Sequence, residues 1–306
     1  MKRILLSLGM IVFVGGIVAG ATGAFFSDTE TSTGNTFAAG DIDLQIDNES
    51  YVTNVAGDLE FSPATSWDLK DLVPGVDHFF DFDDLKPGDL GEDTISIHVG
   101  SNNAWMCAAA QITSDLDNTC TDPEDEAVGE LCTVAIPEDA NGLGELDSAL
   151  NFVFWNDDGD NVYEPSCSQI TGPSCVTENI FLQGPLSGLG LQGQITLADS
   201  QNSILGGNTP IPGDTTFYIG KAWCFGDPVT PGVDQDGFGK TSGPAGVPAA
   251  TNGPIQRPGG VTCNGSGEGN IAQTDSVMGD MQFYAIQARN NAEFLCSEDY
   301  TPSWPN

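Results

Sequence analysis

The chain has 306 residues, of which 39% are hydrophobic, enough for one large β domain with insertions or for two small domains. Asp and Glu number 44 against 8 Lys and Arg, which gives a formal net charge of −36. This balance argues against nucleic acid as a partner, because contacts with phosphates need clustered Lys and Arg. The acidity fits either a surface kept soluble by its charge or carboxylates that bind divalent cations.

The first 23 residues have the three parts of a secretory signal peptide. Two basic residues precede an uncharged apolar run over residues 4–19, and a run of small residues follows. We expect cleavage after Gly23 or Ala24 and secretion of the remaining chain. An uncleaved leader that acts as a membrane anchor is the less favoured alternative.

Residues 24–40 form a separate segment that can extend but buries little by itself. Its stretch 27–35 is small or polar throughout, contains three threonines and lacks proline. Such a segment can join a β-sheet only through its backbone hydrogen bonds, because its side chains bury little surface. Ile42, Leu44 and Ile46 then alternate with polar residues, which is typical of a strand with one buried face.

The rest of the chain shows strands separated by turn signals, and no run of ten or more residues has the apolar period of a helix. Residues 94–99 are the clearest strand, and residues 103–113 follow after a short turn, which predicts a hairpin. Over residues 51–75 the mixed polar and apolar pattern predicts loops with one strand at most. Further strands are predicted at residues 150–155, which should be buried on both sides, and at 179–182, 215–225 and 277–287.

These elements predict an all-β fold, a two-sheet sandwich over residues 41–306 with loop insertions. The insertions are expected at about 115–148, where the chain becomes acidic, and at 226–269, where Gly and Pro replace the apolar pattern. The second insertion should be a long loop held by a disulfide.

The eight cysteines all follow the leader and are even in number, which favours disulfides in an oxidising compartment. The sequence has no Cys-x-x-Cys motif, and this argues against a structural zinc site or a thioredoxin-like redox pair. Eight cysteines allow 105 connectivities, so pairing is a guess. Our guesses are Cys167 with Cys175 and Cys224 with Cys263, each closing a turn-rich loop.

The run Asn-Asp-Asp-Gly-Asp-Asn at residues 156–161 predicts a calcium site. Oxygen side chains around a glycine can wrap a hard cation, and Asp158, Asp160 and Glu164 are the candidate Ca²⁺ ligands. The alternative is a surface turn, because Asp, Asn and Gly favour turns in any case. Residues 234–237 repeat the pattern more weakly.

Three passages share a pattern with a known family. The first runs from Ala-Phe-Phe-Ser-Asp at 24–28, through Asn-Thr-Phe-Ala-Ala-Gly at 35–40, into Asp-Ile-Asp-Leu at 41–44. The second joins Asp-Asp-Leu-Lys-Pro-Gly-Asp at 83–89 to the strand at 94–99, and the third is Asp-Met-Gln-Phe-Tyr-Ala-Ile-Gln at 280–287. They resemble the TasA/camelysin family of secreted proteins, which a SipW-type signal peptidase processes.

The resemblance implies a jelly-roll sandwich and a structural subunit of an extracellular fibre or biofilm matrix, at the cell surface or in the matrix with other components. It further implies strand donation, in which residues 24–40 complete the sheet of the next subunit and build a head-to-tail homopolymer. Phe25, Phe26 and Phe37 are the expected anchors, because the residues between them are too small to bury much surface.

Two other functions remain open at this stage. One is a monomeric secreted or cell-surface binding module that calcium and disulfides stabilise. The other is a camelysin-type metalloprotease. Zinc proteases use motifs such as His-Glu-x-x-His, whereas this chain has only His78 and His98, neither next to a glutamate. We therefore predict that the chain is not an enzyme.

Overall fold

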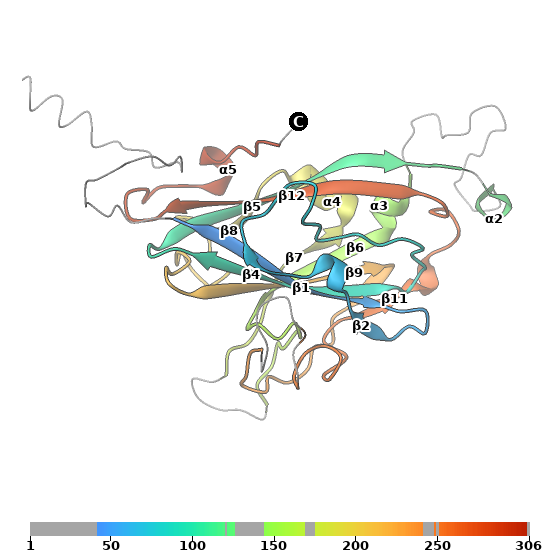
Figure 1. Cartoon of the computed structure of the whole chain (residues 1–306), viewed down its shortest axis with the longest axis horizontal. Helices are drawn as coiled ribbons and strands as arrows, with labels where there is room; N and C mark the ends of the chain where they lie inside the picture. Colours follow the sequence, from blue (N-terminus) through green and yellow to red (C-terminus); the bar gives the residue numbers. More distant parts are fainter. Residues whose placement is uncertain are drawn as a thin grey trace, which may run out of the picture. The chain divides into compact units, whose positions relative to one another are not determined.

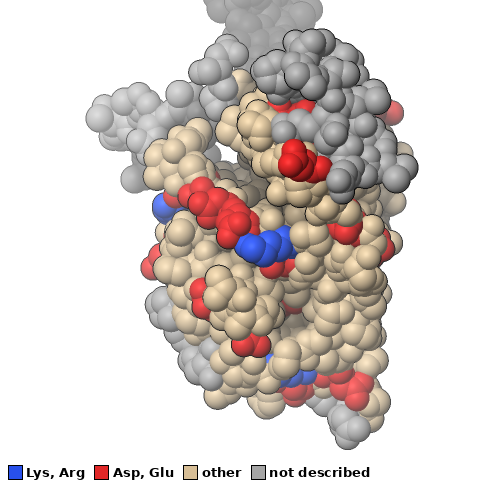
Figure 2. All heavy atoms as spheres, turned by 90° about the vertical axis from the view of Figure 1, so that its right-hand side faces the viewer, with Lys and Arg blue, Asp and Glu red and all other residues tan. Residues whose placement is uncertain are grey.

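The computed structural model describes residues 42–119, 121–125, 144–168, 175–240, 248 and 251–304. The predicted signal peptide and donor segment, with Phe25, Phe26 and Phe37, lie outside the described residues. Across the described ranges, every helix is too short or too polar to cross a membrane. Asp and Glu dominate the charged side chains on the face shown in Figure 2.

The fold is an all-β sandwich whose larger sheet has seven antiparallel strands (Figure 1). The strands are ordered β2-β1-β4-β9-β6-β7, and β3 also pairs with β1. Their bounds are β1 (Leu44–Thr53), β2 (Leu59–Phe61), β3 (Trp67–Lys70), β4 (Leu90–Val99), β6 (Leu150–Asp157), β7 (Ile180–Pro185) and β9 (Thr216–Phe225).

The smaller sheet has three strands in the order β12-β5-β8, namely β12 (Ser276–Gln287), β5 (Ala104–Leu116) and β8 (Ile195–Ala198). A two-stranded ribbon pairs β10 (Asp227–Val229) with β11 (Thr262–Asn264). The helices are short: α2 (Asp122–Asp125), α3 (Leu146–Ala149), α4 (Leu186–Gln192) and α5 (Cys296–Asp299), with 3₁₀ turns η1 (Pro63–Thr65) and η2 (Gly265–Gly267).

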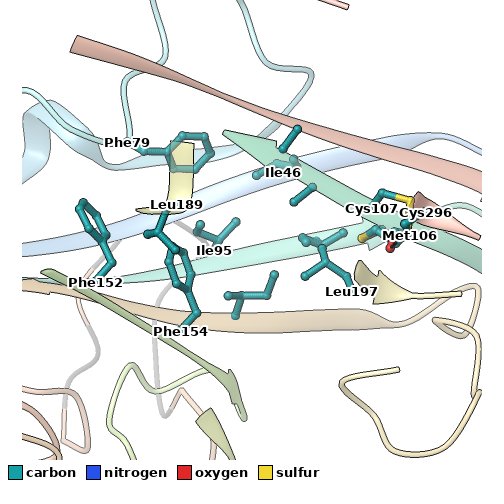
Figure 3. Packing of buried hydrophobic residues seen from close by; sticks show 14 of the residues in the cluster. Ile46, Phe79, Ile95, Met106, Cys107, Phe152, Phe154, Leu189, Leu197 and Cys296 are labelled. Carbon is teal, nitrogen blue, oxygen red and sulfur yellow. Dashed lines mark hydrogen bonds between the residues drawn. A yellow bond between two sulfur atoms is a disulfide. The ribbon is translucent and has the colours of Figure 1, made fainter. Parts of the chain in front are cut away.

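The main core lies between the two sheets, where alternate residues of each strand point inward. Ile46, Ile95 and Phe154 project from the larger sheet, and Met106 and Leu197 come from the smaller one (Figure 3). The outer side of the smaller sheet is covered by the C-terminal segment, which the Cys107–Cys296 disulfide ties to β5. The predicted two-sheet sandwich is therefore confirmed.

The opposite face of the larger sheet carries a second, smaller core. Val153 and Trp155 of β6 pack there with Ala222 and Cys224 of β9 and with Val261 from the long loop before β11. The loops after β6 and after β10 project from this side (lime and orange in Figure 1). Strand β6 is thus buried on both sides, as its continuous apolar run predicted.

Gly220 makes this face possible, because the indole of Trp155 lies directly over it. A Cβ atom added at Gly220 would lie 2.0 Å from Cε2 of Trp155. We expect Gly220→Ala to lower the free energy of unfolding by about 1–3 kcal/mol through overpacking. Chemical denaturation measures this, with Gly267→Ala as the control because no atom lies within 4 Å of its added Cβ. Equal stability of the two variants would contradict the prediction.

A buried ion pair joins two neighbouring strands of the larger sheet on the side of the main core. Nζ of Lys221 on β9 lies 3.0 Å from Oδ2 of Asp93 on β4, and both side chains are fully buried. Asn48 donates a hydrogen bond of 3.2 Å to the other oxygen of Asp93. The Lys221 ammonium also lies 3.7 Å from the ring centre of Phe80. Asp93 thus has a polar partner on each neighbouring strand, Asn48 on β1 and Lys221 on β9.

The structure corrects three expectations about the elements. Strands β4 and β5 do not form a hairpin: β4 pairs with β1 and β9, whereas β5 lies in the other sheet and pairs with β12 and β8. Residues 51–75 contain the end of β1 together with β2 and β3. Residues 226–269 are not merely loop, because they include the β10–β11 ribbon.

The cysteine pairs Cys167–Cys175 and Cys224–Cys263 are those guessed from loop composition, and both have disulfide geometry. The Cys224–Cys263 bond links β9 to β11, so it joins the ribbon to the larger sheet. The Cys107–Cys296 bond was not foreseen. It spans 189 residues of sequence and ties the C-terminal segment to the centre of the smaller sheet.

Candidate functional site

Strand β12 forms one edge of the smaller sheet. It pairs with β5 along its whole length, from Ser276 opposite Leu116 to Gln287 opposite Ala104. Among the strands that the structure describes, β12 has no partner on its other side. A row of backbone N–H and C=O groups is therefore available to a further strand.

Burial along β12 is also that of an edge strand in the described part of the chain. On β5, Met106 is fully buried and Ala108 is 4% exposed. Their partners on β12, Ala285 and Phe283, are only half-buried although they pack against the same core. The difference follows from position, because β5 has a strand on each side and β12 has one on a single side.

The segment between β3 and β4 covers part of this core without joining the sheet. Phe79 contacts Phe283 of β12 with ring centres 6.0 Å apart, Phe80 contacts Phe152, and Phe82 contacts Trp223. No backbone hydrogen bond joins this segment to β12 within the described residues. It caps the core through aromatic side chains and leaves the β12 backbone available.

A cluster of carboxylates lies on the other side of the larger sheet, in the loop that begins where β6 ends. The Asp157 carboxylate accepts hydrogen bonds from the backbone N–H groups of Gly159, at 3.0 Å, and Asn161, at 3.2 Å. Trp155 also donates to it, at 3.1 Å. Both Gly159 and Asn161 have positive φ, so the chain turns sharply here. This turn places Asp158 and Asp160 beside the residues that follow.

Glu178, two residues before β7, holds the loop closed from its other end. Its two oxygens accept from the backbone N–H groups of Asp158, at 3.0 Å, and Glu164, at 2.8 Å. The Cys167–Cys175 disulfide lies three residues beyond Glu164 and three before Glu178. The disulfide therefore keeps these two glutamates together.

A distant segment adds a further carboxylate. Residues 233–235 run beside residues 163–166, with the N–H of Val233 donating to Tyr163 and that of Gln235 donating to Ser166. This brings Asp236 next to Glu164. Arg257 pairs with Asp160, Glu164 and Asp236, and is the only Lys or Arg ion-paired with the cluster in the described residues.

The carboxylates form two groups that share Glu164. Asp158, Glu164 and Glu178 can bring one oxygen each within 4.8 Å of one another, and so can Asp160, Glu164 and Asp236. Burial raises the pKa of Asp158 to about 6 and that of Glu164 to about 7. Burial and the neighbouring carboxylates also raise the pKa values of Asp157, Asp160 and Glu178. The basic side chains of the described residues thus do not fully neutralise the negative charge of these carboxylates.

The sequence indicated part of this cluster. It named Asp158, Asp160 and Glu164; all three lie in the cluster, but Asp158 and Asp160 belong to different groups, which Glu164 joins. The weaker repeat at 234–237 contributes Asp236, whereas Asp234 instead accepts from the Ser166 hydroxyl at 2.5 Å. Glu178 was missed, since it stands in no motif; its place three residues after a cysteine was the only signal. A third carboxylate group, also missed, joins Asp117, Glu124 and Asp275.

Comparison with known families gives one match. Residues 3–83 match the family model described as camelysin metallo-endopeptidase. This stretch is camelysin-like. The resemblance to the TasA/camelysin family is therefore confirmed for the N-terminal part, from the leader through β3 and the aromatic segment. No curated protein sequence matches the chain.

The two histidines do not assemble a camelysin-type zinc site in the described residues. His78 is exposed. His98 lies on the outer face of β4, with Nε2 3.4 Å from Oδ2 of Asp47 and Nδ1 3.2 Å from Oγ1 of Thr216, in a cavity of about 320 Å³. None of the three potential ligand groups among these residues contains a histidine. Their oxygen-only chemistry suits Ca²⁺ or Mg²⁺ better than zinc.

Proposed function

We propose that this chain is a secreted structural subunit of an extracellular fibre or biofilm matrix that polymerises by donor-strand complementation. One observation carries the proposal: β12, twelve residues long, is an edge strand whose backbone is unpaired on one side and whose core residues are half-buried, within the described part of the chain. The family match and the predicted leader support export, with a SipW-type signal peptidase as the processing enzyme and other matrix components as further partners.

The donor in this proposal is residues 24–40 of a second copy. Fully extended, its 17 residues span roughly 55 Å, and β12 needs about 40 Å at about 3.3 Å per residue. Backbone hydrogen bonds supply most of the affinity, because residues 27–35 are small or polar. Phe25, Phe26 and Phe37 anchor the ends of the donor. Donor and acceptor are different surfaces, so the contact is head-to-tail and builds an open filament.

Deleting residues 25–37 tests this function. We expect the processed full-length protein to form fibres in negative-stain electron microscopy and the truncated protein to stay monomeric with an unchanged circular dichroism spectrum. A synthetic peptide of residues 24–40 should then bind the truncated protein one to one. The same peptide with Thr31→Pro and Thr33→Pro should not bind, because proline removes backbone donors.

Three results would contradict the proposal. Fibres formed by the truncated protein would show that the segment is not the donor, and equal binding of both peptides would show that the contact is not strand pairing. A processed full-length protein that stays monomeric under all conditions would also contradict the proposal. It would favour a monomeric binding module, whose binding to its ligand should survive deletion of residues 25–37.

The family description favours a second function, a metallo-endopeptidase. The ligand groups in the described residues offer carboxylates only, so we rank it below the structural role. Incubating the purified protein with casein, with and without a chelator, tests it. Chelator-sensitive cleavage that is lost in His98→Ala would establish the protease; cleavage that His98→Ala retains would point to a contaminant.

A further inference from the structure

We propose that one Ca²⁺ ion binds between Asp158, Glu164 and Glu178, in the loop closed by the Cys167–Cys175 disulfide. This site is independent of the proposed fibre contact, because it lies on the outer side of the larger sheet. The inference starts from the three carboxylates, whose oxygens can lie within 4.8 Å of one another.

Buried oxygens without partners point to a missing ligand. Glu164 is fully buried, and its Oε2 atom has no hydrogen-bond partner, while Oε1 pairs with Arg257. Oδ1 of Asp158 is also buried and without a partner, while Oδ2 accepts from Gln235 at 2.9 Å. A buried carboxylate oxygen without a partner is costly, and a bound cation would remove that cost.

The two halves of the cluster are not equivalent. Arg257 pairs with all three carboxylates of the half formed by Asp160, Glu164 and Asp236. No ion pair within the described residues reaches Asp158 or Glu178. In the half formed by Asp158, Glu164 and Glu178, only Glu164 contacts Arg257, through Oε1, and this half holds the two unpartnered oxygens. Arg257 thus leaves one position for an external cation.

The donor set selects the kind of ion. Every candidate ligand is a carboxylate oxygen, which favours a hard cation over zinc or copper. The ligands come from an irregular loop and from the segment after a disulfide, so they are suited to the flexible coordination of Ca²⁺. Mg²⁺ demands near-ideal octahedral geometry and releases its water reluctantly. Water molecules would complete the coordination shell of Ca²⁺ here.

The test is a titration of the disulfide-bonded, metal-stripped protein with CaCl₂, followed by calorimetry and thermal unfolding. At a hundredfold excess over the dissociation constant we expect the melting temperature to rise by roughly 4–5 °C. MgCl₂ at the same concentration should give less than half of this shift. No shift with CaCl₂ at millimolar concentration, or an equal shift with MgCl₂, would overturn the assignment.

Variants locate the site. Glu164→Gln and Asp158→Asn should each lose most of the calcium-induced shift, and Asp158→Asn covers the case in which Glu164→Gln does not fold. Glu293→Gln, the same chemical change at an exposed position, should retain the full shift. A full shift in both Glu164→Gln and Asp158→Asn would place calcium elsewhere, with Asp117, Glu124 and Asp275 as the next position to examine.

Discussion

Replacing Lys221 by methionine is expected to lower the free energy of unfolding by about 3–5 kcal/mol, because it leaves the carboxylate of Asp93 buried without a countercharge. Asn48 still donates to Asp93 but carries no charge. Burial already raises the pKa of Asp93, and Lys221 opposes that rise. Without the lysine, Asp93 must take up a proton to stay inside. Urea denaturation of the variant and the parent measures the loss.

Two further variants show whether the loss comes from the unpaired charge. Lys70→Met breaks an ion pair whose lysine is 40% exposed, and it should cost no more than about 1 kcal/mol. The double variant Lys221→Met with Asp93→Leu removes both charges and should recover a large part of the loss. If the double variant is as unstable as Lys221→Met alone, the lost contact between the Lys221 ammonium and the Phe80 ring is the cause instead.

In the presence of a chelator, the protein should become less stable as the pH rises from about 4 to 8. Asp158 and Glu164 have folded-state pKa values of about 6 and about 7, above the ordinary values of 3.8 and 4.5. Between these limits the folded state holds more protons than the unfolded state, so raising the pH favours unfolding. The loss should be on the order of 2 kcal/mol, less than the full value of both shifts, because water screens the half-buried Asp158.

Thermal unfolding from pH 4 to 8 measures this slope. Repulsion across an acidic surface acts in the same direction, but 1 M NaCl screens exposed charges and should leave the contribution of the buried cluster. Saturating CaCl₂ should flatten the slope, because a bound cation favours the charged carboxylates. A chelated protein that gains stability between pH 5 and 8 would contradict the prediction.

Local patterns predicted the strands well where alternation or a continuous apolar run was present, as in β4, β6, β9 and β12. They failed for β2, β3 and β8, which have only three or four residues, too few for a period to emerge. The hairpin expected from β4 and β5 was wrong for a different reason. A short turn signal shows that two strands are consecutive, but it does not show that they pair with each other.

The residues of the carboxylate cluster also fall into those that the sequence predicted and those that it did not. Asp158, Asp160 and Glu164 could be named because they follow one another in a turn rich in Asp, Asn and Gly. Asp236 and Arg257 could not be assigned to the same cluster, since they come from a loop about 70–100 residues away in sequence that only packing brings close. Glu178 could not be named although the Cys167–Cys175 bond was guessed, because a disulfide brings two segments together without showing which of their side chains face each other.

The amino-acid sequence by itself determined the class of this protein: an acidic, disulfide-containing β sandwich with a camelysin-like N-terminal part. Composition, period-2 alternation and short motifs are local properties of the chain, and they are sufficient to predict this class. Only the tertiary structure decided which strand lies at the edge, which carboxylates face one another and which lysine is buried. These features depend on contacts between residues far apart in the chain, and no local pattern records such contacts.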